Sequence, residues 1–182
     1  MIDINKIIIR DTPDKFRAMA GKIVPPLLEL LREHASLEAE IFERDEKQRK
    51  EHLAAGGSFN QIAPGFIGLC NEYDRRYLAL VQPRCISGFL KYGAAHSFSK
   101  PAKYSYVDSD PGCQIIFTMK SSQKAIVETH CTSSTWAKTY YPHGVLNKGH
   151  RFTLKPVGDT WLIARVDCAF SANDSWHIEY CL

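Results

Sequence analysis

The stretch that most constrains the fold is residues 151–170, RFTLKPVGDTWLIARVDCAF. Two extended runs flank residues 156–159, where a proline has a fixed φ and a glycine a free one, so the stretch predicts a β-hairpin. Four residues of the second run alternate onto one face, which we expect to be fully buried: Leu162, Ala164, Val166 and Cys168. Trp161 and Ile163 fall on the other face, and we expect Trp161 to be a buried anchor of the sheet.

The first half of the chain has the apolar spacing of helices. Thr12 and Pro13 predict a helix start, with Thr12 as the cap and Pro13 at the first helical position. Pro25 and Pro26 lack the N–H that the helical ladder needs, so we expect them to stop or kink this helix. A second helix is expected to run from the prolines toward Ala55. A third helix is expected over residues 64–82, with its apolar stripe at Phe66, Leu69, Cys70, Tyr73, Tyr77, Leu80 and Val81.

From about residue 102 the chain alternates apolar and polar residues as strands do. Tyr104 and Tyr106 predict one strand, and residues 113–119 and 124–131 predict two more. Short strands are also expected at residues 4–10, where an ordered arm is the alternative, and at residues 175–182.

Helices first and an antiparallel sheet afterwards is the α+β pattern. The chain has 182 residues, enough to bury a core as one domain. We therefore predict a single domain over residues 1–182, with a mainly helical half at residues 1–91 and an antiparallel sheet half at residues 92–182.

Composition and charge narrow the class of protein. The net charge of +3 is too small to favour nucleic acid or an anionic membrane as the main partner. The first residues have no long apolar run, and no segment has the length of a membrane span. None of the six cysteines forms a CxxC or CxxH pair, so the spacing of a zinc site is absent. Without a secretion signal, we expect all six thiols to be reduced. We expect a cytoplasmic protein.

Motifs for catalysis are missing from the sequence. It has no phosphate-binding glycine loop, no nucleophile elbow and no pair of histidines at metal-binding spacing. Four side chains are candidates for a pocket of acid–base character, although each also fits an ordinary core or surface role: Tyr73, Asp74, Tyr77 and His130. We expect no enzyme activity and no cofactor.

Two segments are candidates for binding a protein partner. Residues 132–146 form a long insertion whose aromatic and basic residues lack core periodicity and are typical of interface hot spots: Trp136, Lys138, Tyr140, Tyr141 and His143. The alternative is that the insertion folds back over the open face of the sheet. The second candidate is the charged helix end at residues 38–51, whose acidic side chains would mimic phosphates unless they are simply solvated: Glu38, Glu40, Glu43, Asp45, Glu46 and Glu51.

Residues 92–104, YGAAHSFSKPAKY, resemble the Tyr-Gly-x-x-x-Ser-Phe-x-x-Pro-x-x-Tyr signature of immunity proteins with the nuclear transport factor 2 fold. Residues 124–129, KAIVET, and 155–163, KPVGDTWLI, are similar to two later strands of that family. The resemblance covers about residues 85–182, and it departs from the family at Ala164 and Arg165, where Asp-Ser is usual.

The resemblance implies a nuclear transport factor 2-like (cystatin-like) fold, in which N-terminal helices pack on a curved antiparallel sheet. It also implies a cytoplasmic antitoxin that binds and blocks a cognate secreted toxin of a bacterial polymorphic toxin system. Two alternatives stay open: a small-molecule binder or dehydratase or isomerase of the same fold, and a non-catalytic scaffold that forms a homodimer through the sheet.

Overall fold

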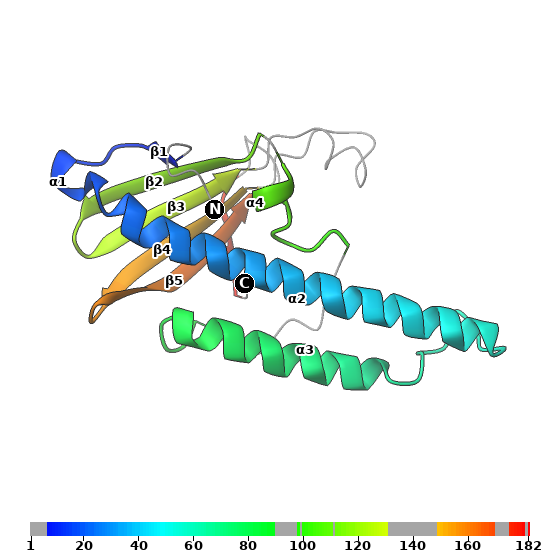
Figure 1. The fold of residues 1–182 in the computed structure, drawn as a ribbon. Coiled ribbons are helices and arrows are strands. Elements are labelled where there is room, and N and C mark those ends of the chain that lie inside the picture. The colour runs from blue at the N-terminus through cyan, green and yellow to red at the C-terminus, as the bar shows by residue number, and fades with distance from the viewer. Residues whose placement is uncertain are drawn as a thin grey trace.

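The protein is an α+β domain in which helices pack against one face of a six-stranded, mostly antiparallel sheet (Figure 1). The computed structural model describes residues 7–89, 98, 100–110, 112–130, 149–169, 175–180 and 182. The helices are α1 (Asp14–Arg17), α2 (Ala20–Ala54), α3 (Phe66–Val81), the 3₁₀ turn η2 (Gln82–Arg84) and α4 (Tyr106–Ser109). The strands are β1 (Ile7–Ile9), β2 (Gln114–Ser121), β3 (Lys124–His130), β4 (Gly149–Val157), β5 (Thr160–Ala169) and β6 (His177–Glu179).

The strands follow one another across the sheet in chain order, from β1 to β6. β1 pairs with β2 in parallel, and every other neighbouring pair is antiparallel. The predicted hairpin is confirmed, because β4 pairs with β5 and the chain turns between Val157 and Thr160. The short strands predicted near the two ends of the chain are confirmed as β1 and β6.

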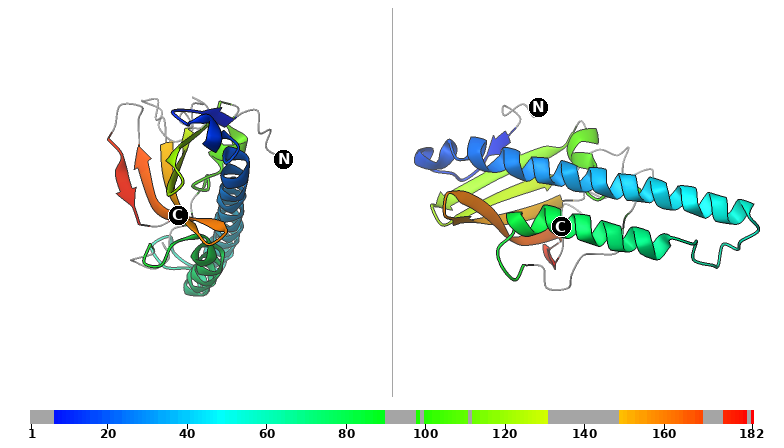
Figure 2. Two further views of the ribbon diagram at one scale, coloured as in Figure 1. Left: turned by 90° about the vertical axis from the view of Figure 1, so that its left-hand side faces the viewer. Right: turned by 60° about the horizontal axis from the view of Figure 1, so that its bottom comes forward.

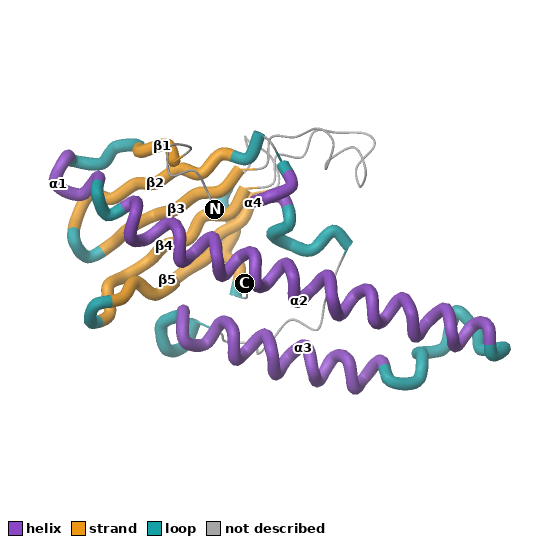
Figure 3. Tube along the Cα trace, viewed as in Figure 1, coloured by secondary structure: helices purple, strands orange, loops and turns teal. Residues whose placement is uncertain are grey.

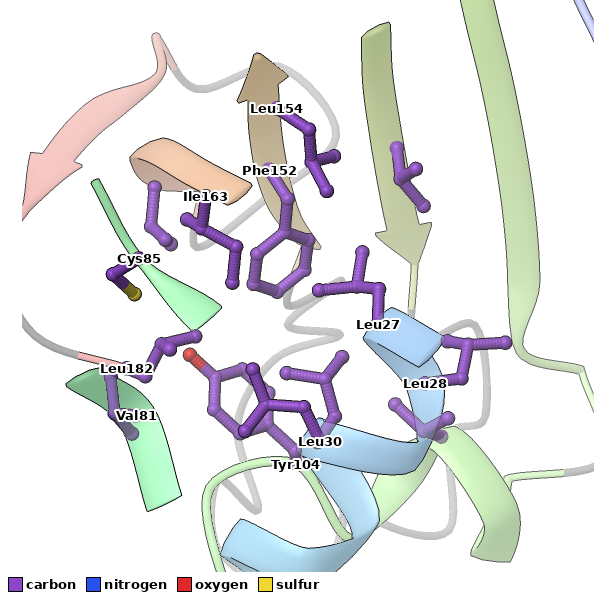
Figure 4. Close-up of a cluster of buried hydrophobic side chains, with 14 of the residues drawn as sticks. Leu27, Leu28, Leu30, Val81, Cys85, Tyr104, Phe152, Leu154, Ile163 and Leu182 are labelled. Carbon is purple, nitrogen blue, oxygen red and sulfur yellow. The ribbon is translucent and has the colours of Figure 1, made fainter. Parts of the chain in front are cut away.

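The core lies between the helices and the covered face of the sheet, where α2 crosses the strands (Figure 2). Figure 4 shows side chains from α2, β4 and β5 pointing toward one another, among them Leu27, Leu30, Phe152 and Ile163. All four are at most 3% exposed, so they leave water almost completely on folding. The predicted stripe of the third helix is confirmed at five buried positions: Leu69, Cys70, Tyr73, Tyr77 and Val81.

The prediction that two prolines divide the helical half is wrong. α2 is one helix from Ala20 to Ala54, with Pro25 and Pro26 inside it. Each proline withholds one N–H from the carbonyl four residues earlier, which belongs to Gly21 or Lys22. Both of these residues are exposed, so water can reach the carbonyls that lack a helical donor. Buried residues on either side, Val24 and Leu27, then hold the helix against the sheet.

The predicted burial pattern of β5 is wrong in its first half because the strand contains a β-bulge. Leu154 pairs with Ile163 but Thr153 pairs with Arg165, so Ala164 is an extra residue on β5. A bulge breaks the period of two. Ile163 and Val166 are therefore both buried, whereas Leu162 and Ala164 are only partly covered. Trp161 is likewise partly buried at the margin of the core rather than a fully buried anchor.

Two local predictions also fail. Thr12 does not cap α1; its hydroxyl donates to the Arg10 carbonyl and accepts the Met119 N–H, which ties the segment before α1 to β2. The tyrosines predicted to lie on a strand instead belong to a turn and to α4, and both Tyr104 and Tyr106 point into the core. Aromatic residues spaced by two fit a strand, but one short helical turn here places both rings in the interior.

Candidate protein-binding surfaces

The aromatic insertion connects two paired strands. His130, the last residue of β3, pairs with Gly149, the first residue of β4, so residues 131–148 leave and re-enter the sheet at one point. Its five candidates lie outside the described residues, and their role stays a prediction: Trp136, Lys138, Tyr140, Tyr141 and His143.

A polar cluster fixes the base of this connection on the face of the sheet opposite the helices. The Nε of Arg151 donates to Glu128 Oε1 at 2.7 Å, and His130 Nε2 lies 3.3 Å from Glu128 Oε2. The contacts from His130 and Arg151 lower the pKa of Glu128 to about 2, against the opposing effect of burial. The Arg151 guanidinium also lies over the Trp176 ring, 4.1 Å from its centroid.

The close packing of this cluster favours a glycine at position 149. A Cβ there would lie 3.2 Å from His130 Nδ1 and 3.3 Å from the far edge of the Trp176 ring. Sequence reasoning missed the pair of Glu128 and Arg151, which face each other across β3 and β4. Opposite charges at directly paired positions are a usual cross-strand contact, but they are visible only once the register of the hairpin is known.

The second candidate surface is a two-helix arm, residues 40–76, which extends past the sheet (Figure 2). Two bidentate ion pairs link its helices. Arg76 binds Glu40 at 2.6 and 2.7 Å, and Arg44 binds Glu72 at 2.6 and 2.8 Å. The hydrogen bond from each arginine lowers the pKa of its carboxylate partner. Since all four side chains are at least partly exposed, these pairs align the helices more than they stabilise them.

The acidic candidates on α2 do not form one exposed acidic surface. Glu43 is exposed and Glu46 is half-buried, with an ion pair to Arg49 at 3.3 Å. Asp45 is only 7% exposed, because it continues the buried stripe of α2, and burial raises its pKa. Glu38 is buried too, and it accepts the Lys103 N–H at 2.6 Å. The structure thus corrects the phosphate-mimic hypothesis for Asp45 and Glu38, whose carboxylates face the protein interior.

The exposed candidates line a groove of mixed charge. A hollow of about 470 Å³ is bounded by Phe42, Glu43, Glu46, Lys47, Lys50, Glu51 and Lys100. Three lysines balance three glutamates in this lining, and Lys47 lies 3.9 Å from Glu51. A surface of balanced charge suits a partner with both signs of charge better than a purely basic one.

The far end of the arm is free of charge. Residues 53–71 contain no Asp, Glu, Lys, Arg or His, and they join α2 to α3 at the end most distant from the sheet (Figure 3). Three large apolar side chains stand open to solvent there: Phe59, Ile62 and Ile67 are 79%, 70% and 68% exposed. Sequence reasoning missed this tip. The available signal was a run of glycines and apolar residues without charge between two highly charged helices.

The interior contains a polar network that the sequence did not reveal. The Tyr106 hydroxyl lies 2.6 Å from Thr129 Oγ1 and 2.6 Å from His150 Nδ1, and all three residues are fully buried. His150 Nε2 lies 3.6 Å from Glu179 Oε2, and Lys103 Nζ approaches the same oxygen at 3.3 Å. These groups come from α4, the sheet and the segments beside them, so only the tertiary fold assembles them.

His34 on α2 lies beside this network. Burial and the nearby Lys103 ammonium lower its pKa to about 3, partly opposed by a backbone contact with Leu182. His34 is therefore neutral at neutral pH, and its approach to Glu38 at 3.6 Å is a polar contact rather than an ion pair. Its ring packs edge-on against Tyr77 and Tyr104.

The acid–base candidates from the sequence are not brought into one site. Tyr73 and Tyr77 are buried core residues of α3, whereas His130 lies on the opposite face of the sheet. Asp74 is also on α3. Burial raises the pKa of Cys70 there, and the charge of Asp74 adds to this effect. Among the residues that the structure describes, no three His, Cys, Asp or Glu side chains are placed to hold a metal ion.

Comparison with known proteins adds no assignment. No family model matches the chain, and neither the curated proteins nor the solved structures contain a significant match. Of the helices described, none is both long and apolar enough to cross a membrane.

Proposed function

We propose that the protein is a cytoplasmic immunity protein of the nuclear transport factor 2-like fold that binds and neutralises a cognate toxin. The family signature at residues 92–104 and the similar strands at residues 124–129 and 155–163 support this proposal. The arrangement of helices on one face of an antiparallel sheet is compatible with that fold.

The observation that carries the proposal is the apolar tip of the arm. Phe59, Ile62 and Ile67 are more than two-thirds exposed, on a segment held away from the domain by two ion-paired helices. An exposed apolar group of this kind favours association, and large side chains ringed by polar residues are typical of interface hot spots. The two helices hold this segment past the sheet, where its side chains can reach the surface of a partner (Figure 2).

Neutralisation on this proposal is occlusion, with no chemistry in the immunity protein. The arm tip enters the toxin, the mixed-charge groove beside Glu43 and Glu46 orients it, and the β3–β4 connection covers a second part of its surface. Residues Trp136, Lys138, Tyr140, Tyr141 and His143 are the predicted contacts of that connection.

The test is co-expression with the toxin encoded by the neighbouring gene, together with binding measurements on the purified proteins. Phe59→Ser and Ile62→Ser should each weaken binding by about tenfold or more and reduce protection, at unchanged melting temperature. Val157→Ser is the matched control, because this apolar residue is also exposed, at 49%, but lies at the turn of the β4–β5 hairpin. Full protection by the Phe59→Ser, Ile62→Ser double variant would reject the tip as the hot spot.

The β3–β4 connection has its own variants. Replacing Trp136 or Tyr141 with Ala should reduce protection at unchanged thermal stability, as expected for interface aromatics. If the protein with Trp136, Tyr140, Tyr141 and His143 all replaced still protects fully, the connection is not a contact surface.

The interior network favours one alternative, a small-molecule binder or enzyme of the same fold. In this network the His150 imidazole lies between the Tyr106 hydroxyl and the Glu179 carboxylate. Acid–base enzymes use groups of these kinds. Failure of the wild-type protein to bind any product of a neighbouring gene would favour this alternative. A dimer in solution that persists on dilution would instead favour the scaffold hypothesis, with pairing through the sheet.

A further inference from the structure

A separate hollow of about 460 Å³ lies between the first turns of α2, η2 and the end of the β4–β5 hairpin. Its floor consists of core residues that are each at most 3% exposed: Ile23, Leu27, Leu30, Leu154 and Ile163. Figure 4 shows four of these floor side chains, Leu27, Leu30, Leu154 and Ile163, gathered between α2 and the sheet. The volume is within the range of about 300–1,000 Å³ that is usual for small-molecule pockets.

The end of the β4–β5 hairpin forms one wall of this hollow. Trp161, Leu162 and Ile163 line it from the part of β5 that lies between the hairpin turn and the bulge at Ala164. Trp161 and Leu162 are only partly covered, and Met19 from the start of α2 is partly covered as well. An apolar chain placed here would bury these three side chains further, with a gain of about 25 cal/mol for each Å² removed from water.

The charged side chains at the rim of the hollow determine which polar group a ligand can carry at its end. Lys22, Arg84 and Asp159 are the charged residues of the lining. Arg84 is already held, since it donates to the Leu80 carbonyl at 2.8 Å and lies 3.1 Å from Glu33. Lys22 is exposed, and no ion pair to it is found among the described residues. Its flexible side chain leaves an ammonium group at the mouth of an apolar hollow.

We propose that this hollow binds an apolar chain that ends in a carboxylate. The chain lies on Leu27 and Ile163 and against Trp161, while the carboxylate reaches solvent at the rim and pairs with the Lys22 ammonium. An alcohol would lose the ion pair, and an amine would meet Lys22 with like charge and pair instead with Asp159, the exposed carboxylate of the same rim. Decylamine that binds as tightly as decanoate would therefore overturn the choice of a carboxylate. The inference rests on this hollow alone and is independent of toxin binding, since the arm tip and its candidate residues do not line it.

The test is calorimetric titration of the full chain with decanoate, decanol and decylamine, each below the concentration at which it forms micelles. Decanoate should bind and should shift the NMR methyl signals of Ile23 and Leu162. Lys22→Glu should weaken the affinity for decanoate by about tenfold and change the affinity for decanol by less than about twofold, as expected when one partly exposed ion pair is reversed in charge. Arg75→Glu is the matched control, since it makes the same change of charge on an exposed position of α3 and should leave decanoate binding unchanged.

A second variant separates the apolar contact from the charge. Trp161→Ala should weaken the binding of decanoate and of decanol to the same extent, because both apolar chains lose their contact with the Trp161 ring. The proposal is overturned if folded wild-type protein does not bind decanoate, if Lys22→Glu binds decanoate as well as wild type, or if the shifted methyl signals lie outside the hollow. Loss of toxin protection is not a readout here, so the two proposals fail separately.

Discussion

Replacing Tyr106 with Phe tests whether the interior network stabilises the fold. The change removes one hydroxyl that lies 2.6 Å from both Thr129 Oγ1 and His150 Nδ1, at a site where all three residues have 0% exposure. The ring itself remains, so no large cavity forms. Two buried polar atoms lose a partner, and each such loss costs roughly 1–3 kcal/mol. We expect the free energy of unfolding to fall by about 2–4 kcal/mol.

Urea unfolding monitored by circular dichroism measures this difference, and the melting temperature should fall by roughly 6–12 °C for a domain of this size. Tyr180→Phe is the matched control: its side chain is 44% exposed, so losing its hydroxyl should cost less than about 0.5 kcal/mol. Combining Tyr106→Phe with Thr129→Val removes both partners of one contact. The double variant should therefore cost about 1 kcal/mol less than the sum of the single changes.

The reasoning is refuted if Tyr106→Phe stays within about 0.5 kcal/mol of wild type. Such a result would mean that Thr129 and His150 find other partners without cost. Strict additivity of the double variant would likewise show that the two hydroxyls are not coupled.

Four further outcomes are expected. The unfolded chain protonates His34 below about pH 6.5, whereas the native histidine has a pKa of about 3, so the free energy of unfolding falls as the pH drops through this range. In urea titrations, His34→Leu should reduce this slope by about 1.4 kcal/mol per pH unit. Glu128, with a pKa of about 2 instead of 4.5, contributes stability above pH 4.5 that is lost toward pH 2; an equally steep acid transition in Glu128→Gln would contradict this. Burial raises the pKa of Cys85 to about 12, so it should react with iodoacetamide on the order of a thousandfold more slowly in native than in unfolded protein, as followed by intact mass. Trp161→Ala should cost about 1–2 kcal/mol by chemical denaturation, because the side chain is only partly buried, and a loss above about 4 kcal/mol would show a deeper anchor than the structure has.

The state of the cysteines was predicted from the sequence and can be compared with the structure. Cys70 and Cys85 are free, buried thiols in the structure, in agreement with the prediction of reduced cysteines that the lack of a secretion signal gave. Cys131 and Cys181 lie outside the described residues, so for them free thiols stay a prediction.

Local patterns in the sequence were enough to predict the class of fold and most of its elements. Periodicity near 3.6 identified α3, and alternation identified β2 and β3, because side-chain direction along one element depends only on local backbone geometry. The turn residues between Val157 and Thr160 identified the β4–β5 hairpin for the same local reason.

Features that depend on contacts between residues distant in the chain became visible only in the folded structure. Pro25 and Pro26 remain inside α2 because burial on either side outweighs two missing hydrogen bonds, and the bulge at Ala164 is fixed by pairing with β4. Tyr106 and His150 come from elements more than forty residues apart, so their contact has no local signature in the sequence. The exposure of Phe59 on the arm is also a tertiary property. A sequence shows that a side chain is apolar, but only the packed structure shows whether anything covers it.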